Sequence, residues 1–153
     1  MSFLSRVCAC LDEQKIPYAI VGGYAVALHG APRATFDIDL IVRFDENDFR
    51  KIEEAFKSIG LVSRLPVTAQ EIFQFRQNYI EQRNLIAWSF VNPQNPIEIV
   101  DIIITDNLAD NSAVEKTLLS GKIRVISKAD LIRMKKRSGR PQDLIDVAAL
   151  EKP

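Results

Sequence analysis

The chain has 153 residues, of which 47% are hydrophobic, and its 20 basic and 20 acidic residues give a formal net charge of zero. This size suits one globular domain, and the charge balance argues against general electrostatic attraction to nucleic acid or to an anionic membrane. The N-terminus lacks the layout of a secretory signal, and no apolar run approaches the roughly 18 residues of a membrane span. We therefore expect a cytoplasmic protein that makes no membrane contact.

The first third of the chain predicts a helix, a strand, a second short helix and a second strand. Apolar residues recur at helical spacing before Pro17, and the apolar run at 18–21 predicts a short buried strand. Gly22 and Gly23 interrupt that run and lead into the second helix. The segment 36–44, FDIDLIVRF, combines β-branched and aromatic residues, so it predicts a strand that carries two aspartates.

The middle of the chain predicts two helices and a pair of strands. Asp45 is the expected N-cap of one helix, and TAQE at 68–71 has the capping-box pattern that opens another. The apolar runs 84–91 and 97–104 flank the turn NPQNP, which favours an antiparallel pair. We expect these two strands to be neighbours in one sheet.

The last part of the chain predicts three helices and one strand. The segment 112–121, SAVEKTLLSG, predicts a helix, and KIRVI at 122–126 predicts a strand. Two further helices are expected at 127–139 and 141–152, separated by a glycine stop and restarted by a proline in the first turn.

These elements predict an α/β (α+β) fold with a mixed central sheet, flanking helices and a helical C-terminal tail. No linker or repeat divides the chain, so we expect one domain over 1–153, with a core at about 1–126 and a helical segment at about 127–153. Cys8 and Cys10 are expected to be reduced packing residues, because one intervening residue points them to different faces of a helix.

Asp37 and Asp39 share one face of their predicted strand, whereas Ile38 and Leu40 point to the other. Two carboxylates about 4 Å apart near a protein surface repel by a few kcal/mol at an effective dielectric of about 20. A divalent cation removes this penalty. Mg²⁺ is the best match, because it takes one or two carboxylates together with phosphate oxygens and water.

Gly22 and Gly23 lie where a strand becomes a helix, so the backbone there can approach a bound anion closely. A phosphate site beside a carboxylate-bound metal implies a nucleoside triphosphate as ligand.

A third acid would complete a two-metal site for phosphoryl transfer. Glu98 and Asp101 are three residues apart in the strand at 97–104, so only one of them can join the face of the first two aspartates. We prefer Asp101, because it is embedded among Val100 and Ile102, where an unpaired charge is costly.

The stretch VGGYAVALHGAPRATFDIDLIV at 21–42 resembles the signature of the DNA polymerase β-like nucleotidyltransferase superfamily. The RATFDIDL segment and the ending ISKADLIRMKKRSGRPQDLIDVAAL resemble the small AbiEii-like nucleotidyltransferases, which include toxins of type IV toxin–antitoxin systems. More distantly, the chain resembles the nucleotidyltransferases that inactivate aminoglycoside or lincosamide antibiotics. The resemblance implies the polymerase β-type nucleotidyltransferase fold.

The resemblance also implies roles for particular residues. Gly22 and Gly23 would bind the triphosphate, and Asp37, Asp39 and Asp101 would be the catalytic residues that hold two Mg²⁺ ions, with Mn²⁺ as an alternative. Asp101 would also help to deprotonate the acceptor hydroxyl.

Three basic residues are further candidates for binding the nucleotide. Arg33 precedes the aspartate strand and either contacts phosphate or braces its loop. Lys135 and Arg140 belong to the dense basic cluster of the C-terminal segment. They either face nucleotide phosphates or a polyanionic acceptor, or they pair with Asp143 and Asp146 within the fold.

An enzyme of this kind transfers a nucleoside monophosphate (NMP) from a nucleoside triphosphate (NTP) to an acceptor hydroxyl and releases pyrophosphate. A tRNA 3′ end, a protein side chain and a small molecule all fit as acceptor, and a cognate antitoxin or another partner protein is also implied. The alternatives are a catalytically silent nucleotide-binding regulator or antitoxin, and an antibiotic nucleotidyltransferase. Three intact carboxylates argue against a silent site.

Overall fold

A computed structural model describes residues 1–153 and contains one mixed sheet of seven strands in the order β3-β4-β5-β2-β1-β7-β6. The strands are β1 (Tyr18–Val21), β2 (Ile38–Val42), β3 (Val62–Ser63), β4 (Ala87–Asn92), β5 (Asn95–Asn107), β6 (Ala113–Leu118) and β7 (Gly121–Ile126). The α-helices are α1 (Phe3–Glu13), α2 (Gly22–Leu28), α3 (Glu46–Ser58), α4 (Ala69–Gln74), α5 (Arg76–Arg83), α6 (Lys128–Ser138) and α7 (Pro141–Glu151). A short 3-10 helix, η1, covers Leu108–Asp110.

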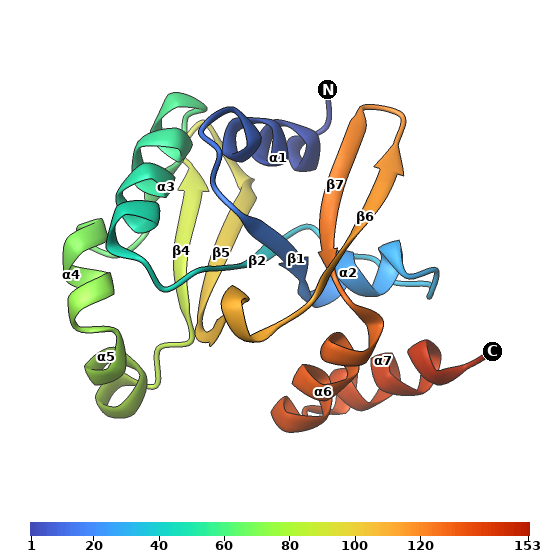
Figure 1. Ribbon diagram of the computed structural model, residues 1–153. Helices are drawn as coiled ribbons and strands as arrows, with labels where there is room; N and C mark the ends of the chain where they lie inside the picture. Colours follow the sequence, from blue (N-terminus) through green and yellow to red (C-terminus); the bar gives the residue numbers. More distant parts are fainter.

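The centre of the sheet is formed by β1, β2 and β5. β1 and β2 are antiparallel, β2 and β5 are parallel, and β4 returns antiparallel to β5 as the sequence predicts. β7 adds to the other side of β1 in parallel, which brings residues 121–126 next to residues 18–21. Figure 1 shows the resulting arrangement, with α1, α3 and α4 on one side of the molecule and the pair α6 and α7 on the other.

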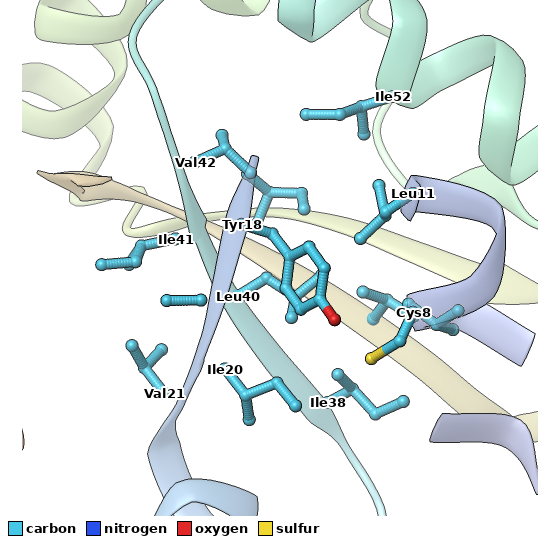
Figure 2. Close-up of a cluster of buried hydrophobic side chains, with 14 of the residues drawn as sticks. Cys8, Leu11, Tyr18, Ile20, Val21, Ile38, Leu40, Ile41, Val42 and Ile52 are labelled. Atoms are coloured by element: carbon cyan, nitrogen blue, oxygen red, sulfur yellow. The ribbon is translucent and has the colours of Figure 1, made fainter. Parts of the chain in front are cut away.

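One face of the sheet forms the main core. Tyr18 and Ile20 of β1 are opposite Val42 and Leu40 of β2, so these side chains point the same way. Figure 2 shows them packed beside Leu11 of α1 and Ile52 of α3. They belong to a cluster of 34 buried hydrophobic residues. The alternation along β2 therefore directs Leu40 into this core and Asp39 to the opposite face of the sheet.

The expected helix starts at Asp45 and Thr68 are confirmed. The Asp45 carboxylate accepts a hydrogen bond from the backbone N–H of Asp48 at 3.0 Å, and Thr68 and Glu71 form a complete capping box. The helix that Thr68 opens is interrupted at Phe75, so α4 and α5 replace one longer helix. No helix combines the length and apolar character needed to cross a membrane.

The predicted helix at 112–121 is wrong. Residues 113–118 form β6, which pairs antiparallel with β7 from Ala113↔Ile126 to Leu118↔Gly121. The tight turn between the strands ends at Gly121, whose φ of +133° suits glycine. The β-branched residues Val114 and Thr117 favour a strand, and pairing with β7 outweighs the helical spacing of the segment.

Candidate active site

The candidate site begins where β1 ends. Gly22 has a φ of +66°, and a Cβ atom at this position would lie 2.1 Å from Oδ2 of Asp39. A Cβ on Gly23 would lie 3.0 Å from Cβ of Thr35. The double glycine therefore lets the backbone of the β1–α2 turn pack directly against the strand that carries the aspartates.

The sheet register aligns side chains of four neighbouring strands. Val21 of β1 is opposite Asp39 of β2, Asp39 is in register with Asp101 of β5, and Asp101 is opposite Ser89 of β4. Asp37 lies in the bend just before β2 and is exposed. We call Asp37, Asp39 and Asp101 the acidic row. The structure thus brings the three predicted carboxylates together beside the start of β2, near the centre of the sheet.

The acidic row lacks a full set of compensating charges. Burial and the charges of Asp101 and Asp37 together raise the pKa of Asp39 to about 7, against smaller lowering effects of Lys135 and Arg140. The pKa of Asp101 is raised by burial and by the charge of Asp37, against the lowering effect of a nearby Ser89 hydroxyl. Bringing a cation to these groups would favour their ionised forms.

The donor set of the acidic row fits Mg²⁺ or Mn²⁺. All three side chains offer carboxylate oxygens, the ligands that hard cations prefer. No three His, Cys, Asp or Glu side chains converge closely enough to enclose a metal ion by themselves. Mg²⁺ does not need such an enclosure, because it keeps several waters and shares its coordination with substrate phosphates.

A cleft of about 600 Å³ lies over the acidic row. Its lining contains all of the predicted site residues: Gly22, Gly23, Arg33, Asp37, Asp39, Asp101, Lys135 and Arg140. Carboxylates from the sheet thus face basic residues from α6 and from the start of α7 across one cavity. Ligand sites of this volume are common for nucleotide-sized molecules.

The two alternatives for the basic residues are both partly realised, because these residues line the cleft and also pair within the fold. Lys135 is buried, and its Nζ lies 3.2 Å from Oδ1 of Asp143 and 3.0 Å from Oδ2 of Asp146. Nε of Arg140 donates to Oδ2 of Asp143 at 2.8 Å, although 70% of the Arg140 side chain is exposed. Lys135 therefore links α6 to α7, whereas Arg140 keeps most of its surface free for a ligand.

Arg33 braces its own loop. Its Nε lies 3.3 Å from Oδ1 of Asp146, and its Nη1 donates to the carbonyl oxygen of Ala34 at 2.8 Å. The contact with Asp146 connects the loop before β2 to α7.

Asp143 remains charged in the folded protein. Burial would raise its pKa, but hydrogen bonds from Arg140 and Lys135 outweigh burial and lower the pKa to about 2.

Glu98 and His29 lie outside the cleft lining. Glu98 accepts hydrogen bonds from Arg6 and from Nδ2 of Asn92, so Asp101 is the acid of this strand that joins the acidic row. Nε2 of His29 lies 2.7 Å from the carbonyl oxygen of Ile126, so this histidine links the end of α2 to the end of β7.

One side of the cleft was not predicted from the sequence. Ile103 and Thr105 line the cleft because they follow Asp101 at intervals of two residues and so share its face of β5. The periodicity of a strand could have predicted this. Arg137 of α6 donates to both carboxylate oxygens of Asp106 at 2.7 and 2.8 Å, and both residues line the cleft. No local signal predicts that pair, because 30 residues separate its members.

A family model described as "Nucleotidyl transferase AbiEii toxin, Type IV TA system" matches residues 2–152. The chain belongs to this AbiEii nucleotidyltransferase family. It is a nucleotidyltransferase, and the resemblance found in its sequence is confirmed. A search of curated protein sequences gave no significant match.

Solved structures share the fold of this AbiEii family member. An antigenic nucleotidyltransferase-like protein from Paracoccidioides brasiliensis gives a TM-score of 0.59 at 20% identity, over 95% of this chain and 72% of that chain. The lincomycin-bound lincosamide antibiotic adenylyltransferase LnuA gives 0.63 at 17% identity, over 98% and 95%. The antibiotic-resistance factor ANT(2'')-Ia gives 0.66 at 13% identity, over 97% and 80%. These likenesses confirm the expected polymerase β-type nucleotidyltransferase fold.

Proposed function

We propose that this chain transfers an NMP from an NTP to an acceptor hydroxyl, with release of pyrophosphate, at the acidic row. The observation that carries the proposal is the arrangement around Asp39. This residue is in register with Asp101 on one side and is in close contact with Gly22 on the other. This arrangement joins a carboxylate site to a turn whose backbone can approach phosphate.

In the proposed reaction, the acceptor oxygen attacks the α-phosphorus. A bond forms between them, the bond from the α-phosphorus to the oxygen that bridges to the β-phosphate breaks, and pyrophosphate leaves with that electron pair. The Asp101 carboxylate accepts the proton of the acceptor hydroxyl. The protein contributes mainly by holding these groups in place within the cleft.

Asp37, Asp39 and Asp101 would hold two Mg²⁺ ions, or Mn²⁺ in their place. When bound, such ions supply positive charge at the transferred phosphoryl group and at the leaving pyrophosphate. The raised pKa of Asp39 supports this assignment, because burial and the two neighbouring carboxylates disfavour its ionised form unless a cation is present.

The triphosphate would lie between the β1–α2 turn and the basic side of the cleft. Gly22 and Gly23 offer backbone at close range, and the largely exposed Arg140 side chain is available for direct phosphate contact. Lys135 and Arg33 add positive potential while they hold α7 and the loop before β2.

The family assignment supports a role as the toxin of a type IV toxin–antitoxin system, with a cognate antitoxin as partner. The acceptor would then be a cellular hydroxyl whose modification stops growth, and a tRNA 3′ end, a protein side chain and a small molecule are the classes to compare.

Transfer of labelled nucleotide tests the proposal. Purified protein would be incubated with Mg²⁺ and each of the four α-labelled NTPs, together with total tRNA, a protein lysate or a small-molecule extract. Asp39→Ala removes a central carboxylate. Asp110→Ala is the matched control, because Asp110 is an exposed acid on η1 outside the cleft lining.

The expected result is label on one acceptor class with the wild type and with Asp110→Ala, and none with Asp39→Ala. Intact NTP binding without transfer to any class would contradict the proposal and favour a nucleotide-binding regulator. Transfer that survives Asp39→Ala would contradict the assignment of the site.

A further inference from the structure

Ser89 carries a buried hydroxyl that the proposed reaction does not use. It lies on β4 directly opposite Asp101 on β5, so the two side chains share one face of the sheet. Its Oγ is buried and makes no hydrogen bond in the structure. A buried polar atom without a partner destabilises a folded protein, so its presence at this position needs an explanation.

The other buried side-chain atoms without a hydrogen bond are Nε of Arg33 and Oδ2 of Asp146. Each has an opposite charge nearby. Nε of Arg33 lies 3.3 Å from Oδ1 of Asp146, and Oδ2 of Asp146 lies 3.0 Å from Nζ of Lys135. Ser89 has neither kind of partner, and it is the one that borders the acidic row.

The backbone of Ser89 is fixed on both sides. It pairs with Asp101 on one side, and on the other its carbonyl oxygen accepts a hydrogen bond from the backbone N–H of Arg64 at 2.8 Å. The neighbouring Trp88 and Phe90 are buried on the opposite face of the sheet. The hydroxyl can therefore turn about its own bonds, but the residue cannot move away from Asp101.

Ser89 approaches Asp101 from the side away from the other aspartates. Across the sheet the order is Asp39, Asp101, Ser89, and only the two aspartates line the cleft. Ser89 would therefore act on a ligand in the cleft only indirectly, through its contact with Asp101. A serine hydroxyl suits this place, since it can donate one hydrogen bond to a carboxylate and takes little room.

We propose that Ser89 is a positioning residue for Asp101, whose hydroxyl donates a hydrogen bond to the Asp101 carboxylate in the loaded cleft and fixes its orientation toward the acceptor hydroxyl. This inference rests on the proposed function. Partners of this kind, one shell behind a metal-binding group, typically change activity or metal affinity by about 10- to 100-fold.

Three variants test the inference. Ser89→Ala removes the hydroxyl, Ser89→Thr keeps one, and Ser58→Ala is the control for serine loss, because Ser58 bonds only to Ala55 at the end of α3. The measurements are the single-turnover rate, the KM for NTP, the affinity for Mn²⁺ in the presence of a non-hydrolysable NTP analogue, and the melting temperature.

We expect Ser89→Ala to slow single turnover by about 10-fold or more, to weaken Mn²⁺ binding, and to change the KM for NTP by less than about twofold. Its melting temperature should equal or exceed that of the wild type, because an unpartnered buried hydroxyl is removed. Ser89→Thr should recover most of the rate, and Ser58→Ala should match the wild type.

A Ser89→Ala variant with wild-type rate and Mn²⁺ affinity would overturn the inference. So would a loss of rate that accompanies a lower melting temperature and is not restored by Ser89→Thr, because that pattern indicates a structural role. If the wild type itself transfers no nucleotide, the proposed function fails, and the Mn²⁺ affinity of Ser89→Ala against wild type alone decides the role of Ser89.

Discussion

Gly22 packs directly against the Asp39 carboxylate. A Cβ atom on residue 22 would lie only 2.1 Å from Oδ2 of Asp39, so the carboxylate already occupies the space of a side chain. The same glycine has a left-handed backbone, with a φ of +66°. Two separate requirements therefore exclude any side chain at this position, one from backbone conformation and one from the acidic row.

Gly22→Ala should separate those two requirements when it is compared with Gly30→Ala. Gly30 also has a positive φ, +95°, but a Cβ there would meet no atom within 4 Å. Gly30→Ala should cost about 1–2 kcal/mol of stability with activity retained. Gly22→Ala should cost more in urea denaturation and should lower nucleotide transfer at least ~10-fold, because Asp39 must move. Equal effects of the two substitutions on transfer would contradict this account.

Asp39→Asn should stabilise the metal-free protein while it abolishes transfer. The Asp39 carboxylate is held in a half-buried site beside two other acids, and burial is the main reason for its raised pKa. Removing its charge should raise the free energy of unfolding in the presence of a chelator by at least ~1 kcal/mol at pH 8. Thermal denaturation with and without chelator measures this effect, and Asp110→Asn should show no gain. A lower melting temperature for Asp39→Asn would show that the carboxylate is already neutralised within the fold.

Asp143 should make stability depend on acid pH. Its pKa in the folded protein, about 2, is below the value of about 3.9 for an unfolded aspartate, so the folded state favours the ionised form. This stabilisation is fully present above about pH 5 and is lost as the pH falls through 4 toward 2.

In Asp143→Asn the dependence of the urea midpoint on pH between 5 and 3 should become shallower. The variant should also be less stable at pH 7, by about 1–3 kcal/mol, because the buried Lys135 loses one of its two carboxylate partners. Glu115→Gln is the control, since the pair of Glu115 with Lys122 is exposed. An unchanged pH profile for Asp143→Asn would contradict the assigned pKa.

Arg137→Ala should loosen the connection between α6 and β5. The Asp106 side chain is 5% exposed and would lose its charged partner, which should destabilise the protein by about 2–4 kcal/mol. The double variant Arg137→Ala with Asp106→Ala should be more stable than Arg137→Ala alone, because no buried charge remains. Lys136→Ala should change stability by less than ~0.5 kcal/mol, since its pair with Glu151 is exposed. If the effects of Arg137→Ala and Asp106→Ala on stability simply add in the double variant, direct coupling between these two side chains is contradicted.

Much of the acidic side of the site follows from local sequence patterns. Alternation in a strand predicts that Asp37 and Asp39 share a face, and the three-residue spacing of Glu98 and Asp101 allows only one of them to join. The structure agrees on the second point, because Asp101 and not Glu98 lines the cleft; Asp37 precedes β2 and lies in the bend before it, although it lines the cleft together with Asp39. The helix starts at Asp45 and Thr68 were also predictable, because an N-cap hydrogen bond joins residues only three positions apart.

The basic side depends on contacts between distant segments, so local patterns left it open. The sequence could not decide between a free and a paired Lys135, and the answer depends on how α7 packs against α6. Strand β6 was assigned as a helix because its pairing with β7 decides its conformation. Ser89 gave no signal at all, since its position opposite Asp101 exists only in the assembled sheet.

The two sides of the cleft come from different parts of the chain, which the parallel contact between β7 and β1 brings together. The strands that carry the acidic row end at residue 107, whereas Lys135 and Arg140 follow β7 and lie near the end of the chain. All residues of the acidic row are therefore translated before Lys135 and Arg140, and the cleft is complete only after α6 and α7 have packed onto the sheet.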